Sequence, residues 1–170
     1  MRYTSSEANK LLKGLEGRIA DLKRRENKSR SFNAASIEDP EDLRPAYDFE
    51  ETQKQLDALE HDVRTVKHAI NVFNVTHTLP GFDDMTIDQA LVYLPQLSNR
   101  VRKLQDMAAA LPKERVESFR SNIIDYVIAN YDIDDAGKAY HAEQEKLKAI
   151  QLALDAANSG DTMEIDVSLM

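Results

Sequence analysis

The histidine and asparagine side chains between residues 61 and 77 are the first candidates for chemistry. His61, His68 and Asn71 are spaced seven and three residues apart, so a helix would place them along one side, with His77 further on. Imidazole nitrogens bind divalent transition metals. Two helical turns between the imidazoles span about 10 Å, however, which is too far for one ion without a ligand from another helix. A solvated helix face is therefore the favoured interpretation, and a divalent-metal or small-ligand site is the alternative.

A second candidate is a twelve-residue segment with part of the spacing of an EF-hand calcium loop. Asp132, Asp134 and Glu143 stand at its first, third and twelfth positions, where such a loop needs carboxylates. The fifth position is Ala136, which cannot coordinate an ion. An apolar seam also runs through Ala136 and predicts a helix across this segment. We therefore expect Asp134 or Asp135 to be the N-cap of that helix, and no calcium site.

Several patterns needed for known chemistries do not occur in the sequence. There is no cysteine, so disulfides, thiolate zinc sites and cysteine nucleophiles are excluded. The sequence also contains no Glu-x-x-His pair for a di-iron bundle, no phosphate-cradling glycine loop and no Gly-x-Ser-x-Gly elbow. These observations predict a protein that is not an enzyme and has no cofactor.

The charge is distributed unevenly along the chain. Residues 1–30 hold nine Lys or Arg against four acids, whereas residues 38–62 hold ten acids against two bases. The cluster at residues 23–30 has the charge of a nucleic-acid patch, but no aromatic residue interleaves it. An antiparallel helix pair would instead set the basic segment beside the acidic one. Internal charge pairing is therefore expected, and nucleic-acid binding is the less favoured interpretation.

The first two helices are predicted from capping and periodicity. Thr4 and Glu7 have the spacing of a capping box, so a helix should begin there and fade near residue 30. Its predicted apolar stripe consists of Ala8, Leu11 or Leu12, Leu15, Ile19 and Leu22. Residues 31–45 contain two prolines and turn-forming residues, which predicts a mobile loop. A second helix over roughly residues 46–77 carries an apolar seam with steps of four and three, typical of a coiled coil: Leu56, Leu59, Val63, Val66, Ile70 and Phe73.

This seam is the predicted partner-binding surface. The first helix is too short to cover the seam along its whole length, so the part from Leu56 to Val66 is expected to meet a second subunit, with a dimer favoured. Asn71 and Asn74 lie near the seam, and amides in such positions set register or partner orientation through a buried hydrogen bond. Asn71 and Asn74 are therefore interpreted as register residues.

The second half of the chain is predicted to hold two more helices and a small β element. Pro80-Gly81 marks a turn, and Thr86 with Gln89 forms a second capping box that begins a third helix, kinked but not broken near Pro95. Residues 115–131 fit either a helix or a strand, and we favour a strand over 123–131. A final helix should end at residues 158–160. The tail 159–170 contains an alternating segment that could pair with the strand at 123–131.

These elements, in this order, resemble a known group of proteins. The shared features are a basic capped helix, an acidic loop, a heptad helix that ends in Ile70-Asn71-x-x-Asn74, a Thr-capped helix with Ala90-Leu91, a short strand near Tyr126-Val127, and a closing helix that ends in Leu154-Asp155-Ala156-Ala157-Asn158. The chain thereby resembles small bacterial proteins sometimes labelled septicolysin-like. This resemblance implies a helical hairpin fold and no established activity. Pro95 and the tail after Asn158 depart from the pattern.

The sequence thus predicts a mainly α protein. We expect one helical domain over residues 1–170, an elongated antiparallel bundle or coiled coil of about four helices with a small β element near its C-terminal part. The absence of a long apolar segment and of cysteine predicts a cytoplasmic protein that does not associate with membranes. The favoured function is that of a structural or interaction protein that forms a homo-oligomer or binds a protein partner.

Overall fold

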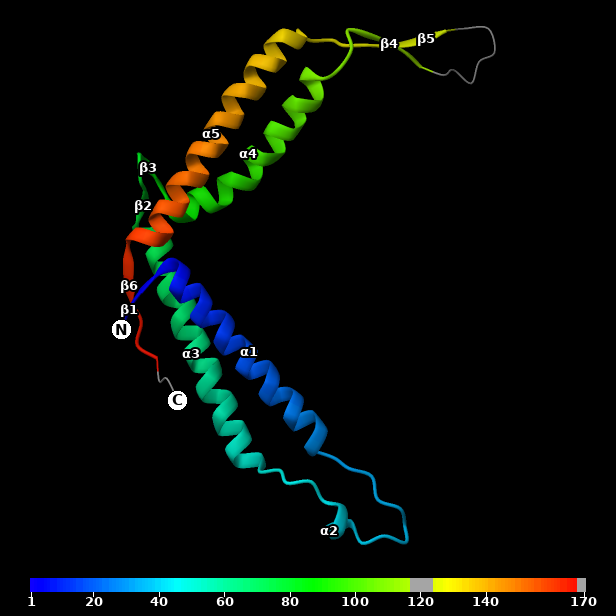
Figure 1. The fold of residues 1–170 in the computed structure, drawn as a ribbon, viewed down its shortest axis with the longest axis vertical. Coiled ribbons are helices and arrows are strands. Elements are labelled where there is room, and N and C mark those ends of the chain that lie inside the picture. Colours follow the sequence, from blue (N-terminus) through cyan, green and yellow to red (C-terminus); the bar gives the residue numbers. More distant parts are fainter. Residues whose placement is uncertain (117–123, 168–170) are drawn as a thin grey trace. The chain divides into compact units, whose positions relative to one another are not determined.

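The computed structural model describes residues 1–116 and 124–167, and it is mainly helical with small antiparallel strand pairs (Figure 1). The chain divides into two compact units. The first consists of Met1–Asn74 and Asn158–Met170, and the second of Val75–Ala157. One helical domain over residues 1–170 stays a prediction. None of the described helices is both long and apolar enough to cross a lipid bilayer.

The first unit is built on an antiparallel pair of helices, α1 (Ser5–Ser29) and α3 (Phe49–Thr76), which lie side by side in Figure 1. Two ion pairs connect them. The Lys23 Nζ lies 2.9 Å from the Glu60 carboxylate, and the Lys67 Nζ lies 2.9 Å from the Glu16 carboxylate. The prediction that basic α1 would pair with acidic residues of the following helix is therefore confirmed at Lys23.

Helix α1 begins as the sequence predicts. The Thr4 hydroxyl accepts a hydrogen bond from the Glu7 N–H at 3.2 Å, and the Glu7 carboxylate accepts one from the Thr4 N–H at 2.8 Å. These two bonds form the capping box that satisfies two otherwise unpaired helix N–H groups. Ala8, Leu15 and Leu22, which repeat every seven residues, are buried. The periodicity therefore identified the inner face of α1 correctly.

The apolar seam of α3 is largely buried within the single chain. Leu56, Val66, Ile70 and Phe73 are all buried, and Val66 is completely inaccessible. The prediction that the part from Leu56 to Val66 would be left for a second subunit is therefore wrong for those two residues. The argument from helix length failed because α1, with 25 residues, is nearly as long as α3, with 28 residues, and lies beside it (Figure 1).

Residues 31–45 contain one more helix, the short α2 (Pro40–Leu43), which the sequence analysis did not predict. The Asp39 carboxylate caps it by accepting a hydrogen bond from the Glu41 N–H at 3.0 Å. Proline at the first helical position suits this start, because that N–H has no intrahelical partner.

The two ends of the chain meet in a strand pair of the first unit. Strand β1 (Arg2–Thr4) pairs antiparallel with β6 (Thr162–Glu164), with Tyr3 opposite Met163. A strand in the tail is thus confirmed, but its expected pairing with the strand at 123–131 is wrong. Strand β1 is only three residues long and runs directly into α1, which is why the sequence pattern did not reveal it. The last residues of the tail, 168–170, lie outside the described residues.

The second unit begins with a tight hairpin. Strands β2 (Thr78–Leu79) and β3 (Phe82–Thr86) are joined through Pro80-Gly81, where Gly81 has a φ of 79°. Proline followed by glycine with positive φ is the combination that a type II turn requires, so the predicted turn is confirmed. Leu79 is completely buried and forms part of the core of this unit.

The helices of the second unit are α4 (Ile87–Ala108) and α5 (Ile133–Gly160). The predicted capping box of α4 is present, with the Thr86 hydroxyl 3.2 Å from the Gln89 N–H, and the helix continues through Pro95. Leu97 of α4 and Ile150 of α5 are completely buried in one cluster with Leu79 and Ala90. The two helices are also connected by the Arg100–Glu143 ion pair, at 3.4 Å.

The start of α5 differs from the prediction by two or three residues. The Asp132 carboxylate accepts a hydrogen bond from the Asp135 N–H at 3.0 Å, so Asp132 is the N-cap in place of Asp134 or Asp135. An aspartate at any of these positions is favoured by the helix dipole, which is why sequence reasoning could not choose among them. Because the helix runs from Ile133, this segment does not form a calcium loop.

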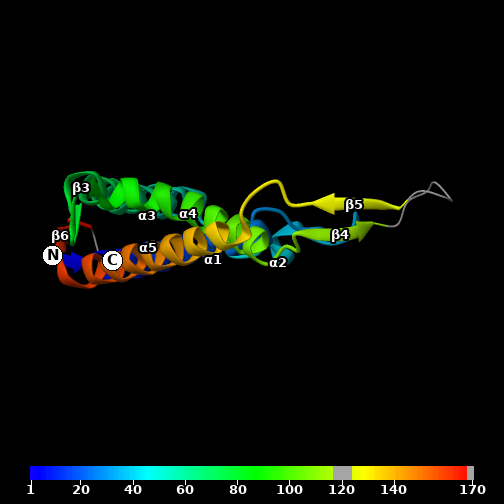
Figure 2. The same cartoon turned by 90° about the horizontal axis from the view of Figure 1, so that it is seen from above.

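A two-stranded ribbon completes the second unit. Strand β4 (Lys113–Val116) pairs antiparallel with β5 (Asp125–Ile128), and both views show the ribbon projecting past the ends of α4 and α5 (Figure 1, Figure 2). The favoured strand at 123–131 is therefore confirmed over residues 125–128. Residues 117–123, which include part of the region predicted as helix or strand, lie outside the described residues.

Candidate functional site

The histidines and asparagines considered as an alternative ligand site are not grouped around one point. His61, His68 and Asn71 are exposed on α3, whereas Asn74 and His77 are half-buried. The His77 carbonyl accepts a hydrogen bond from the Ile87 N–H at 3.0 Å, so this backbone helps to join the hairpin to α4. Among the side chains that the structure describes, no three His, Asp or Glu are grouped as a metal ion would require.

The register role proposed for Asn71 and Asn74 needs a buried amide. Asn71 is exposed in the single chain, so it does not fix the pairing of α1 with α3. Asn74 is half-buried. Register setting by these residues between two chains stays a prediction.

The acidic residues of α5 are also separated. Asp132 caps the helix, Asp134 is exposed, and Glu143 pairs with Arg100. Glu143 follows Asp132 by eleven positions along the helix, which corresponds to about 16 Å. These side chains therefore stabilise the helix and the α4–α5 pair, and they do not surround a common point.

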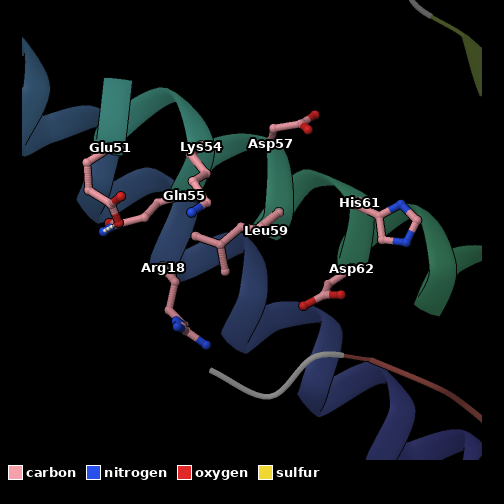
Figure 3. Close-up of a pocket in the computed structure, with 9 residues that line it drawn as sticks. Arg18, Glu51, Lys54, Gln55, Asp57, Leu59, His61 and Asp62 are labelled. Carbon is pink, nitrogen blue, oxygen red and sulfur yellow. Dashed lines mark hydrogen bonds between the residues drawn. The ribbon is translucent and has the colours of Figure 1, made fainter. Parts of the chain in front are cut away.

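Helix α3 contributes most of a groove in the first unit (Figure 3). The groove has a volume of about 600 Å³ and is lined mainly by residues of α3, with one residue from α1: Arg18, Glu51, Lys54, Gln55, Asp57, Ala58, Leu59, His61 and Asp62. Figure 3 shows the Asp62 carboxylate directed toward α1 and Asp57 directed away from it. The groove thus combines both signs of charge with an apolar wall.

Asp62 is the notable residue of this groove, because it is only 5% exposed. Aspartate is rarely buried to this extent, since removal of a carboxylate from water is costly unless it gains a partner. Asp62 was not predicted as a site residue, because it is one of ten acids in residues 38–62 and little in the local pattern distinguishes it from the others. Its position one residue before the seam residue Val63 was the only available signal.

A second feature is the exposed apolar surface of the β4–β5 ribbon. Tyr126, Val127 and Ile128 are 45%, 59% and 66% exposed, although they are successive residues of one strand. Val116 on β4 is also exposed. Successive side chains of a strand point to opposite faces, so apolar residues are presented on both faces of the ribbon.

The ribbon is anchored at its base to the helices. The Ala129 N–H donates to the Pro112 carbonyl at 3.1 Å, and the Tyr131 hydroxyl donates to the Met107 carbonyl of α4 at 3.0 Å. The Lys113 Nζ also lies 3.9 Å above the ring of Tyr126, within the range of a cation–π interaction. The sequence predicted the strand from its β-branched and aromatic residues, but it gave no sign that these residues would stay exposed.

The comparisons with known proteins bear on the fold alone. No protein-family model matches the chain, and no curated protein matches it. The fold is similar to the crystal structure of a functionally unknown conserved protein from Corynebacterium diphtheriae, with a TM-score of 0.60 and 18% sequence identity over 96% of this chain and 100% of the other. This likeness supports the mainly helical fold with its small strand pairs.

Proposed function

We propose that this protein is a non-enzymatic interaction protein that associates with copies of itself through the β4–β5 ribbon. The observation that carries the proposal is the exposure of apolar side chains on both faces of that ribbon. Exposed apolar surface of this kind often marks an interaction site, because its burial by a partner removes it from water. Full burial of one exposed Val or Ile side chain contributes about 1.5–3 kcal/mol.

The form of the element supports the same function. A two-stranded ribbon that projects from a protein is only marginally stable in water, since each strand has one unpaired edge and two solvated faces. Its sequence would be expected to be polar if it served only to connect α4 with α5. Three consecutive apolar residues in β5 instead favour a partner that covers them.

Association through the helical seam is less favoured. A coiled coil between chains would need the seam of α3 to be accessible, but Leu56, Val66, Ile70 and Phe73 are buried in the chain itself. Leu59 and Val63 are half-buried, so they could contribute only a narrow apolar strip. An elongated bundle formed by several chains remains compatible with association at the ribbon.

Sedimentation velocity tests this proposal. The wild-type protein should sediment faster as its concentration rises, and the double variant Tyr126→Ser/Val127→Ser should remain monomeric. The matched control is Val92→Ser/Leu152→Ser, which removes similarly exposed apolar side chains from α4 and α5. The proposal fails if the ribbon variant associates as strongly as the wild type, or if the control loses association to the same degree.

The groove on α3 favours a second candidate function, the binding of a small molecule that carries an ammonium group. The buried Asp62 carboxylate would pair with that group, and the half-buried Leu59 would contact an alkyl chain. Titration with 1,4-diaminobutane, followed by NMR signals of α3, tests it. Asp62→Asn should abolish the shifts and the exposed Asp57→Asn should retain them. The absence of shifts in the wild type would contradict this candidate.

The basic cluster of α1 is not proposed as a nucleic-acid site. Lys23 pairs with Glu60 of α3, and Arg24 pairs with Asp21 one turn earlier, at 3.2 Å. Acids that already contact these cations would compete with phosphate groups and repel them. This arrangement favours the structural interpretation of the cluster.

A further inference from the structure

The register of the β4–β5 ribbon determines which side chains share a face. Residues directly opposite one another in an antiparallel pair point to the same side, and successive residues alternate between sides. Lys113 lies opposite Ile128, and Arg115 lies opposite Tyr126. These four residues form one face, here named the basic face. The position of the Lys113 Nζ above the Tyr126 ring agrees with this assignment.

The opposite face has the complementary charge. Glu114 lies opposite Val127, and Val116 lies opposite Asp125. These four residues form the acidic face. Each face therefore has two charges of one sign next to two apolar side chains, and all eight residues are exposed. Basic and acidic residues are separated onto opposite faces because the charges alternate in sign along β4. Apolar residues are found on both faces because those of β5 are consecutive.

We infer that the occupant of this ribbon is the ribbon of a second copy of the chain, with the basic face of one copy packed on the acidic face of the next. This inference rests on the proposed function and specifies its partner and geometry. Packing two basic faces together would set Lys113 and Arg115 near the same residues of the other copy, at a cost in like-charge repulsion. Packing unlike faces pairs the charges and buries apolar side chains on both sides.

An interface between unlike faces has a consequence for assembly. Each copy has one basic face and one acidic face. A copy that binds through one of them leaves the other free to bind a further copy. The association is therefore head-to-tail and does not stop at a two-fold dimer unless a ring closes. Four side chains on each face are far fewer than the roughly 20–30 residues per side of a stable interface. The association should thus be weak and dependent on concentration.

Two charge-reversed variants test the inference. Lys113→Glu/Arg115→Glu makes both faces acidic, and Glu114→Lys/Asp125→Lys makes both faces basic. Each variant alone should self-associate about tenfold more weakly than the wild type in sedimentation velocity, because every contact now joins like charges. An equimolar mixture of the two should regain association at least to the wild-type level. Circular dichroism of each variant establishes that its helices are intact.

The control variant is Lys10→Glu/Lys13→Glu at exposed positions of α1. It changes the net charge by the same amount as Lys113→Glu/Arg115→Glu does. It should associate like the wild type. The wild type should also associate more weakly as salt is added, a measurement that needs no variant. The inference is overturned if the mixture associates no better than its components, if the control loses as much as the ribbon variants, or if salt has no effect.

These outcomes separate the inference from the proposed function. If Tyr126→Ser/Val127→Ser abolishes association but the mixture of charge variants shows no recovery, the ribbon is the interaction site and the pairing of unlike faces is wrong. If the serine variant associates as the wild type does, the proposed function itself fails.

Discussion

Both units are built on an antiparallel helix pair, but the segments that connect the two helices of each pair differ. The α1–α3 pair is joined by residues 30–48, which contain the short α2, the Arg44–Glu41 ion pair and two exposed apolar residues, Ile37 and Leu43, that are six positions apart. The α4–α5 pair is joined through the β4–β5 ribbon, with apolar residues exposed on both faces. Both connections thus have exposed apolar residues, but only in the ribbon are these residues consecutive in one strand.

This difference shows which parts of each unit already bury their apolar side chains within the chain. Within each pair, periodic apolar residues are buried, as Leu15 and Val66 are in one and Leu97 and Ile150 in the other. The ribbon has no comparable burial in the described residues, because its side chains are presented away from the helices on both faces. Interaction is therefore expected at the connection of the second unit and not at the helical seams.

The largest predicted effect concerns the cores of the two units. Leu97→Ala should lower the free energy of unfolding of the second unit by about 2–5 kcal/mol, because Leu97 is completely buried and its truncation leaves a cavity. Leu15→Ala should cost a similar amount in the first unit. Urea denaturation measures the loss, and hydrogen exchange shows whether α4 or α1 is affected. The exposed Leu152→Ala is the control, and a loss as large there would contradict the assignment of the core.

The two capping boxes should contribute smaller and nearly equal amounts. Thr4→Ala and Thr86→Ala each remove the hydroxyl that accepts the N–H of the third helical residue, at 3.2 Å in both helices. Each should lower stability by about 1 kcal/mol. Thermal unfolding compares them with Ser6→Ala, an exposed position within the first turn of α1. Unequal losses would show that one helix start is held mainly by its tertiary contacts.

The ion pairs between helices should differ between the units. Double-mutant cycles at the exposed Glu16–Lys67 pair should give a coupling of about 0.2–1 kcal/mol. The Arg100–Glu143 pair is longer, at 3.4 Å compared with 2.9 Å, but only 23% of the Glu143 side chain is exposed. We expect the reduced screening at Glu143 to outweigh the extra distance. A smaller coupling at Arg100–Glu143, or equal sensitivity of both pairs to salt, would reverse this ranking.

The smallest predicted effect is a pH dependence on the acid side at the start of α1, which the start of α4 lacks. The backbone hydrogen bond from Thr4 lowers the pKa of Glu7 below its usual 4.5, and the Thr4 hydroxyl adds to this. Ionised Glu7 therefore stabilises α1 above about pH 4.5, and this contribution is lost as the pH falls through the lowered pKa. The equivalent residue of α4 is Gln89, which does not titrate.

Exchange of these two residues provides the test. Glu7→Gln should flatten the acid side of the stability profile, and Gln89→Glu should introduce such a dependence at α4. Chemical denaturation between pH 3 and pH 6 measures both. Profiles that are unchanged in both variants would show that the capping carboxylate does not contribute to the acid response.

The resemblance to septicolysin-like proteins, the cytoplasmic location and homo-oligomerisation stay predictions. The structural similarity to the protein from Corynebacterium diphtheriae adds evidence about the fold and none about activity. Of these predictions, oligomerisation is the one that the ribbon experiments address directly.

The sequence by itself determined the four long helices, the inner face of α1 and the starts of α1 and α4. Helical periodicity and capping depend on residues within a few positions of one another, which is why Ala8, Leu22 and both capping threonines could be identified correctly. The turn at Gly81 was predicted for the same reason. Only the tertiary structure decided what covers each face. The pairing of β1 with β6, the burial of Asp62 and Val66, and the exposure of the ribbon all depend on segments far apart in the sequence, whose contacts no local pattern specifies.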